Sequence, residues 1–157
     1  MKKNIIVKLC VMSLVIALDI VTKIVFLDKH YPFLKGFISI HSNYPEYNKG
    51  GSFGILQEHT WLLILISIVF LVFLVLFDFK YKPESKVYNI GFSFVVGGAI
   101  GNLIDRVFIG GVRDFICFDF WPEFPLFNLA DTFLCIGVVL FAIYIIFIHK
   151  DKKESKK

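Results

Sequence analysis

The stretch "GNLIDRVFIGGVRDF", residues 101–115, directly follows an apolar run of membrane-spanning character, yet it carries two aspartates, two arginines and an asparagine. An ionisable side chain at membrane depth costs roughly 2.5 to 3.5 kcal/mol or more and usually marks a functional site. The stretch therefore predicts a polar site at the point where a helix leaves the bilayer.

The composition of the whole chain also indicates a membrane protein. Of its 157 residues, 57% are hydrophobic and 19 are phenylalanine, and the mean hydropathy is +0.72; soluble domains have roughly half their residues apolar. Four apolar runs reach the roughly 17 to 25 residues of a spanning helix. Because lipid offers no hydrogen-bond partners to backbone N–H and C=O groups, segments of this length should be helical. We predict an all-α membrane protein, a single domain over residues 1–157, with spans at 5–27, 61–79, 87–104 and 130–148.

The first three spans differ in character. The second carries no ionisable residue over 61–77, which predicts a lipid-facing helix. The first begins with "MKK", as a signal peptide does, but its apolar run exceeds the roughly 7 to 15 residues of a signal-peptide core and no small-x-small cleavage motif follows. We expect it to be retained. In the third, Gly97 and Gly101 are four residues apart and predict a close helix–helix contact.

The lysines predict the orientation of the chain in the membrane. Most of the 17 basic residues lie beside the start of the first span, between the second and third spans, or after the fourth, and basic residues mark the cytoplasmic side. Both termini are therefore predicted to be cytoplasmic, with a basic tail at 149–157 and outer segments at 28–60 and 105–129. The net charge of +4 is then explained by lysines that orient the chain in the membrane, and no nucleic-acid partner is expected. The lysines concerned are Lys2, Lys3, Lys8, Lys80, Lys82, Lys86, Lys150, Lys152, Lys153, Lys156 and Lys157.

Both outer segments mix β-branched and aromatic residues with glycine, proline and asparagine. This mixture is typical of short strands joined by turns, so we expect a small extracytoplasmic β-cradle on the membrane surface. Its exposed aromatic residues, Trp121 among them, suit the membrane interface.

The cysteines and histidines give no sign of a metal site or of a cysteine nucleophile. Three cysteines and four histidines form neither a C-x-x-C nor an H-E-x-x-H pattern, so we expect no metal and no cofactor. Cys10 and Cys135 are predicted to be small buried apolar residues.

Polar side chains gather at the outer ends of three spans, at one depth. Asp19 and Lys23 are four residues apart and share a helical face, so they could pair; Asp105 and Arg106 could likewise form an ion pair. Single pairs of this kind are often structural, but several of them at one membrane depth favour a site. The members of the group are Asp19, Lys23, Asn102, Asp105, Arg106, Asn128 and Asp131.

Two carboxylates, Asp114 and Asp131, stand out as a chemical pair. Asp114 could be a solvated loop charge, and Asp131 could complete a capping box with Asn128. If the two approach in a partly desolvated pocket, like-charge repulsion raises one pKa, so that the pair holds one base and one acid at neutral pH. Such a pair hydrolyses amides, because the ionised member activates water and the protonated one polarises the carbonyl. The positive end of the fourth helix favours ionised Asp131, which leaves the proton on Asp114.

Two other classes of protein can group such residues in a membrane. A channel or transporter would be expected to carry its charges across the bilayer, whereas these lie at one face. A scaffold would explain the spans and the lysines but has no need of both aspartates.

Five ordered motifs resemble those of lipoprotein signal peptidase, the type II signal peptidase of bacteria, and extend over nearly the whole chain. They are "DIVTK" (19–23), "NKGGSFG" (48–54), "GNLIDR" (101–106), "VRDF" (112–115) and "FNLAD" (127–131). The resemblance implies a four-helix aspartic intramembrane endopeptidase of the bacterial cytoplasmic membrane, with its site at the outer leaflet. It implies removal of signal peptides from prolipoproteins immediately before a diacylglyceryl-modified cysteine, without a cofactor, in contact with membrane lipids and with sensitivity to globomycin-type inhibitors. We also expect a monomer.

The motif match places the catalytic pair on Asp114 and Asp131. Arg106, by its fixed charge and fork of donors, could hold a substrate carbonyl or orient a carboxylate, and the asparagines could fix substrate and dyad without adding charge. Gly50 and Gly51 would let the loop backbone approach the peptide. The residues placed around the pair are Asp19, Lys23, Asn48, Gly50, Asn102, Asp105, Arg106, Asn128 and Ala130.

The chain departs from the family pattern at a few positions, none of which removes a dyad carboxylate. They bear on loop geometry, substrate preference and inhibitor affinity. These departures are Ile20 in place of a common glutamine, Gly51 and Ser52 within a usual Gly-Ala-Ala-Phe, Arg113 in place of an apolar residue, and a longer loop before Asn48 that contains Pro45 and Glu46.

Overall fold

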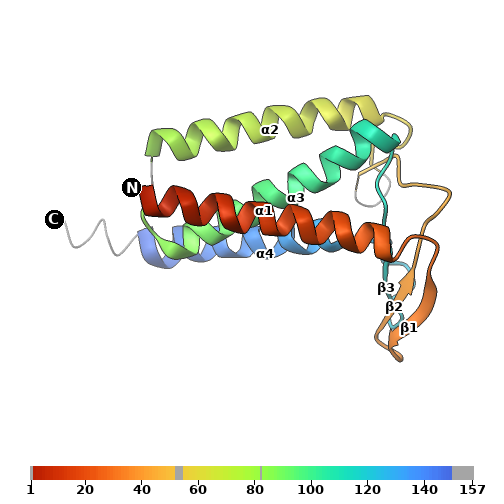
Figure 1. The fold of residues 1–157 in the computed structure, drawn as a ribbon. Helices are drawn as coiled ribbons and strands as arrows, with labels where there is room; N and C mark the ends of the chain where they lie inside the picture. Colours follow the sequence, from red (N-terminus) through yellow and green to blue (C-terminus); the bar gives the residue numbers. More distant parts are fainter. Residues whose placement is uncertain (1, 52–54, 82, 150–157) are drawn as a thin grey trace.

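Four long helices and a three-stranded sheet make up the structure (Figure 1). The computed structural model describes residues 2–51, 55–81 and 83–149. Its helices are each long and apolar enough to cross a membrane, which confirms the four predicted spans. Ser52, Phe53, Gly54, Lys82 and the basic tail from residue 150 lie outside the described residues. The helices are α1 (Lys2–Val25), α2 (Thr60–Tyr81), α3 (Lys86–Ile109) and α4 (Leu129–Ile143), the last continued by π-helical turns over Tyr144–His149.

α3 begins and ends on residues that satisfy its backbone. The side chain of Ser85 accepts a hydrogen bond from the backbone N–H of Tyr88, and Gly110 closes the helix in the left-handed conformation at φ +80°, which glycine adopts without steric cost. The helix therefore continues past its predicted end at residue 104, because the chain offers no helix-ending residue before Gly110. Asp105 and Arg106, assigned to an outer segment from the sequence, are helical.

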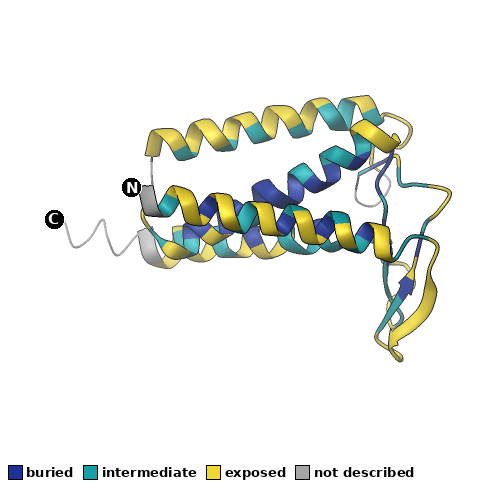
Figure 2. Cartoon of the chain, viewed as in Figure 1, coloured by how far each residue is buried: buried dark blue, intermediate teal, exposed yellow. Residues whose placement is uncertain are grey.

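α3 is the central helix and contains many buried residues, whereas α2 is exposed along its length (Figure 2). α3 packs against α1 and α4, and Tyr88, Phe92 and Val96 form a buried core on it. No residue of α2 is buried, in agreement with the lipid-facing helix predicted. The prediction for the cysteines is wrong, since Cys10 and Cys135 are exposed. In lipid the outer surface of a bundle is itself apolar, so a small apolar residue gains little from the interior.

Glycines allow α3 to approach α1 closely. A Cβ added to Gly97 would lie 2.8 Å from Cγ1 of Val15 on α1, and one added to Gly101 would meet the carboxylate of Asp19. Neither position has room for a side chain. The predicted close contact at these two glycines is confirmed, and its partner is α1.

A partly buried ion pair attaches α2 to the rest of the bundle. Nζ of Lys8 on α1 contacts the carboxylate of Asp78 on α2. It also lies 5.4 Å and 5.1 Å from the ring centroids of Tyr88 and Phe92 on α3, where a cation–π attraction adds to the pairing. From the sequence, Lys8 only indicates the cytoplasmic side of the membrane. In the structure it also holds α1, α2 and α3 together.

The outer segments form the predicted sheet, at the end of the bundle opposite the first residues of α1 (Figure 1). β1 (His30–Leu34) pairs antiparallel with β2 (Ile38–His41), and β2 pairs antiparallel with β3 (Ile116–Phe118). An isolated bridge between Asn48 and Val112 joins the two outer segments a second time. The chain after α1 is thus tied to the chain after α3. Exposed aromatic side chains on these segments include Phe33, Phe37, Phe120 and Trp121.

Filling the α1–α3 contact should destabilise the bundle. We expect Gly97→Val to cost about 1–3 kcal/mol, because the added methyl groups overlap the Val15 side chain in a closely packed contact. The midpoint of thermal unfolding in detergent should fall accordingly. Ala17→Val is the matched control, since Ala17 is exposed on the same helix as Val15; an equal fall in both variants would contradict the contact.

Candidate active site

A lysine lies buried between two aspartates where α1 meets α3. Nζ of Lys23 is 2.8 Å from Oδ2 of Asp19 and 3.4 Å from Oδ2 of Asp105, and it donates a hydrogen bond to Oδ1 of Asn102 at 2.9 Å. All three charged side chains are 0% exposed. Charges removed from water in this way are tolerated when they are paired and hydrogen-bonded. The predicted Asp19–Lys23 pair is therefore present as part of a larger network.

Asp105 pairs with Arg113 and not with Arg106, so that part of the prediction is wrong. Nη2 of Arg113 is 2.6 Å from Oδ1 of Asp105, and its Nε and backbone N–H donate to Oδ2 at 3.2 Å and 3.0 Å. Arg106 follows Asp105 directly on α3, and successive helical residues point about 100° apart. Arg106 therefore reaches a different partner, the carbonyl oxygen of Gly50, at 3.2 Å.

The first turn of α4 is held by side chains from two helix ends. Oδ1 of Asn128 accepts from the backbone N–H of Asp131 at 3.0 Å, while Oδ2 of Asp131 accepts from the backbone N–H of Asn128 at 3.2 Å. This is the capping box considered from the sequence. The backbone N–H of Ala130 donates to Oδ1 of Asp19 at 2.9 Å. α1 is thereby fixed to the start of α4.

The two predicted dyad carboxylates share one asparagine. Nδ2 of Asn128 donates to Oδ1 of Asp114 at 2.7 Å, and the same residue caps the helix that carries Asp131. The second oxygen of Asp114 accepts from Nδ2 of Asn48 at 2.9 Å, and Oδ1 of Asp131 accepts from Nδ2 of Asn102 at 2.8 Å. Both carboxylates line one cavity. Each asparagine predicted around the pair thus binds one of its carboxylates.

A further asparagine, which the sequence did not single out, positions the backbone at Asp114. Oδ1 of Asn43 accepts from the backbone N–H of Asp114 at 3.2 Å, and Nδ2 of Asn43 donates to the carbonyl oxygen of Val112 at 3.0 Å. The backbone N–H of Asn43 also donates to the carbonyl oxygen of Asp114 at 3.0 Å. In the sequence Asn43 lies two residues before Pro45, which is the ordinary pattern of a turn, so no signal separates it from a turn residue.

Asp114 is 3% exposed, so the alternative of a solvated loop charge is wrong. Burial, and next the charge of Asp131, raise the pKa of its carboxyl from 3.8 to about 7. Hydrogen bonds from Asn48 and Asn128 and the charge of Lys23 act in the opposite direction. Burial prevails because removal of water disfavours the charged form. The carboxyl therefore keeps its proton to a higher pH than an ordinary aspartate does.

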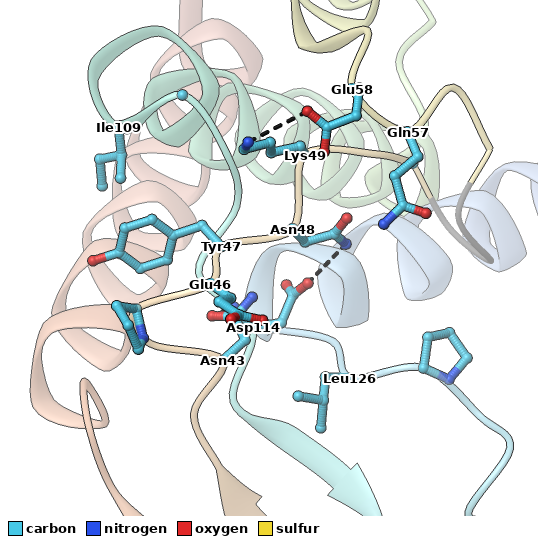
Figure 3. Close-up of a pocket in the computed structure, with 14 residues that line it drawn as sticks. Asn43, Glu46, Tyr47, Asn48, Lys49, Gln57, Glu58, Ile109, Asp114 and Leu126 are labelled. Atoms are coloured by element: carbon cyan, nitrogen blue, oxygen red, sulfur yellow. Dashed lines mark hydrogen bonds and ion pairs between the residues drawn. The ribbon is translucent and has the colours of Figure 1, made fainter.

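Two cavities meet at Asp114. The first has a volume of about 430 Å³ and is mostly apolar, with Phe118, Phe127 and Ile136 in its wall. The second has a volume of about 780 Å³ and is lined mainly by polar loop residues, with the Asn48–Asp114 hydrogen bond at its centre (Figure 3). The residues that line both cavities are Asn48, Gly51, Asp114, Pro125 and Leu126.

The donors around the carboxylates are amides and cationic side chains. Within residues 2–51, 55–81 and 83–149, no three His, Cys, Asp or Glu side chains are grouped as metal ligands would be. The arrangement offers a buried acid beside a second carboxylate, in a cavity that water can reach from the polar side. Such an arrangement is suited to hydrolysis by general acid–base catalysis.

Comparison with known proteins identifies the family of the chain. A family model described as signal peptidase (SPase) II matches residues 11–147. Two solved structures described as bacterial membrane enzymes determined by the in meso method have the same fold. The one at 2.3 Å resolution is 32% identical over 94% of this chain and 92% of that chain, with a TM-score of 0.83. The one at 1.9 Å is 32% identical over 89% and 92%, with a TM-score of 0.78. Since the family model covers most of the chain, the protein belongs to the signal peptidase II family and is a membrane-spanning peptidase.

Proposed function

We propose that the protein is a bacterial lipoprotein signal peptidase, an aspartic endopeptidase of the cytoplasmic membrane. It cleaves prolipoprotein signal peptides immediately before the diacylglyceryl-modified cysteine, with Asp114 and Asp131 as the catalytic residues. The observation that carries the proposal is the buried carboxyl of Asp114, which has a pKa of about 7 and is held by Asn128 beside Asp131. A carboxyl of raised pKa next to a second carboxylate can supply an acid and a base near neutral pH.

The reaction needs one ionised and one protonated carboxyl. Asp131, at the positive end of α4, accepts a proton from a water molecule as the water oxygen attacks the scissile carbonyl carbon. Asp114 donates its proton to the carbonyl oxygen, which becomes a hydroxyl in the tetrahedral intermediate. When the C–N bond breaks, the hydroxyl returns a proton to Asp114, and the departing nitrogen takes the proton from Asp131. The dyad is then restored.

The apolar cavity suits the acyl chains of the substrate. Each buried methylene contributes about 0.8 kcal/mol, so the lipid brings the peptide to the dyad with little need for sequence recognition. Arg106 lines the same cavity, and its Nε has no hydrogen-bond partner among the described residues. This N–H is itself buried, so a carbonyl oxygen of the peptide would reach it only after the Arg106 side chain shifts.

We further propose that both termini face the cytoplasm and that the site faces outward, in a monomeric, single-domain protein. Lys80 and Lys86 lie where α2 ends and α3 begins, at the end of the bundle that also holds the start of α1 (Figure 1). Basic residues favour the cytoplasmic side. The dyad, at the opposite end beside the sheet, then meets the lipid-modified cysteine at the outer surface.

A labelling experiment tests the orientation. In a variant with all three cysteines replaced by serine, we expect Glu123→Cys to react with a membrane-impermeant maleimide in intact spheroplasts, because residue 123 is exposed in the segment between β3 and α4. Lys80→Cys, at the other end of the bundle, should react only after the membrane is permeabilised. The reverse pattern would contradict the positive-inside assignment.

Substitution of either dyad residue should abolish cleavage. With a diacylglyceryl-modified prolipoprotein and the purified protein in liposomes, we expect Asp114→Asn and Asp131→Asn each to lower the cleavage rate roughly 10²- to 10⁴-fold, the usual contribution of a general acid or base. Asp119→Asn is the matched control, because Asp119 lies in the same outer segment as Asp114 and lines neither cavity. Mass spectrometry of the products locates the cut.

The same variants separate the three classes of protein. A scaffold or assembly factor tolerates both substitutions as long as folding survives, and a transporter shows flux in liposomes without cutting. A near-normal cleavage rate in either variant, at a thermal stability matched to the wild type, would remove the dyad assignment.

The protonation of Asp114 predicts the alkaline limit of activity. Its folded-state pKa of about 7 lies above the ordinary 3.8, so the neutral form that donates the proton is lost as the pH rises through about 7. We expect kcat/KM to fall about tenfold per pH unit above that value. The linked stability has the same sign, since it is fully present below about pH 4 and is lost as the pH rises through about 7. Asp119→Asn should keep the same alkaline limit, and a limit at pH 9 or above in the wild type would contradict Asp114 as the acid.

A further inference from the structure

One cavity beside the dyad is used neither by acyl chains nor by the proposed acid–base chemistry. It is the polar cavity of about 780 Å³, formed by loop residues 43–51, by Gln57 and Glu58, and by the end of α3 (Figure 3). Its volume lies within the range of roughly 300–1,000 Å³ typical of ligand sites. It shares Asn48 and Asp114 with the apolar cavity, so a peptide that occupies both cavities would lie beside Asp114.

We propose that this polar cavity binds the first residues of the mature lipoprotein, those that directly follow the modified cysteine. The inference rests on the proposed function. The scissile bond joins a signal peptide in lipid to a cysteine whose acyl chains stay in lipid and whose polypeptide continues into water. The acyl chains take the apolar cavity, and polar peptide groups cannot follow them without losing hydrogen bonds. The polar cavity gives the peptide a path from Asp114 to water.

The polar cavity carries an excess of negative charge. Nζ of Lys49 lies 3.3 Å from Oε2 of Glu58, so these two charges offset each other (Figure 3). Glu46 is exposed and forms no ion pair within the part of the chain that the structure describes. Asp114 adds negative charge whenever it is ionised. The cavity should therefore favour lysine or arginine after the modified cysteine and disfavour aspartate or glutamate.

The chain directly after Glu46 is anchored beside Asp114. Two residues further on, Asn48 binds the carboxylate of Asp114, and its backbone N–H and C=O pair with those of Val112 at 3.0 Å and 2.8 Å. From the sequence we also expect this loop to be longer than the family pattern. A charge at this position is thus suited to select among substrates of this particular enzyme.

The test compares three synthetic prolipopeptides that carry serine, lysine or aspartate at all three positions after the diacylglyceryl-modified cysteine. The full-length protein is assayed in liposomes of zwitterionic lipid, so that the membrane itself does not select by charge. We expect kcat/KM to follow the order lysine, serine, aspartate, with about two- to fivefold between steps, the size of an exposed charge interaction. The difference should lie in KM and should shrink at high salt.

Substitutions at Glu46 should change this order. Glu46→Gln should bring the lysine and aspartate peptides closer together, and Glu46→Lys should reverse their order. Glu123→Gln is the matched control, because it removes the same charge from an exposed residue of the other outer segment that lines neither cavity. It should leave the order as in the wild type.

Two results would overturn the assignment of this cavity. One is an equal kcat/KM for the three peptides in the wild type, and the other is an order that Glu46→Lys leaves unchanged. Photo-crosslinking tests the position directly: a photoreactive residue three places after the cysteine should label residues among 43–51 or 57–58, and labelling of α4 near Cys135 would contradict the proposal. Failure of the proposed function is distinguishable, since the wild type would then cleave none of the three peptides.

Discussion

The buried ammonium of Lys23 is the interaction on which the rest of the structure depends. It is paired with Asp19 on its own helix and with Asp105 on α3, and it donates to Asn102, which in turn binds Asp131. Removal of one partner from a buried pair costs about 3–5 kcal/mol, because the other charge is left uncompensated. The packing of α1 on α3 and the orientation of Asp131, a carboxylate of the proposed dyad, are therefore fixed by the same charge.

Asn128 has a structural and a chemical role at once. Its Oδ1 caps α4 through the backbone N–H of Asp131, while its Nδ2 donates to Asp114. The cap fixes the helix that carries one carboxylate, and the donor fixes the other carboxylate relative to that helix. An aspartate at position 128 would also cap the helix. It would, however, place a third carboxylate between Asp114 and Asp131, and it lacks the N–H group that binds Asp114. An amide is therefore the side chain that serves both purposes.

The spans, the strands and the common depth of the polar residues could be predicted, because each depends on a pattern within a short segment of sequence. The Asp19–Lys23 pair and the Asn128–Asp131 capping box could be anticipated in the same way, but the partners of Asp105 and of the backbone at Asp114 could not. Asp105 binds Arg113, and the backbone at Asp114 binds Asn43; these contacts form only when the outer segments fold back on the helices. The end of α3 was mispredicted for a local reason, since the edge of an apolar run is not the end of a helix and Gly110 provides the stop.

The four charges of the Lys23 network cancel, which leaves burial as the main control of Asp114. Lys23 and Arg113 offset Asp19 and Asp105. With an apolar residue in place of Arg113, the two aspartates would share one ammonium, and the surplus anion would disfavour ionisation of the nearby dyad. With Arg113 present that surplus is absent, and the pKa of about 7 at Asp114 follows from burial first and from the second dyad carboxylate next. Burial of Asp114, reinforced by the charge of Asp131, thus raises its pKa without any additional anion from the Lys23 network.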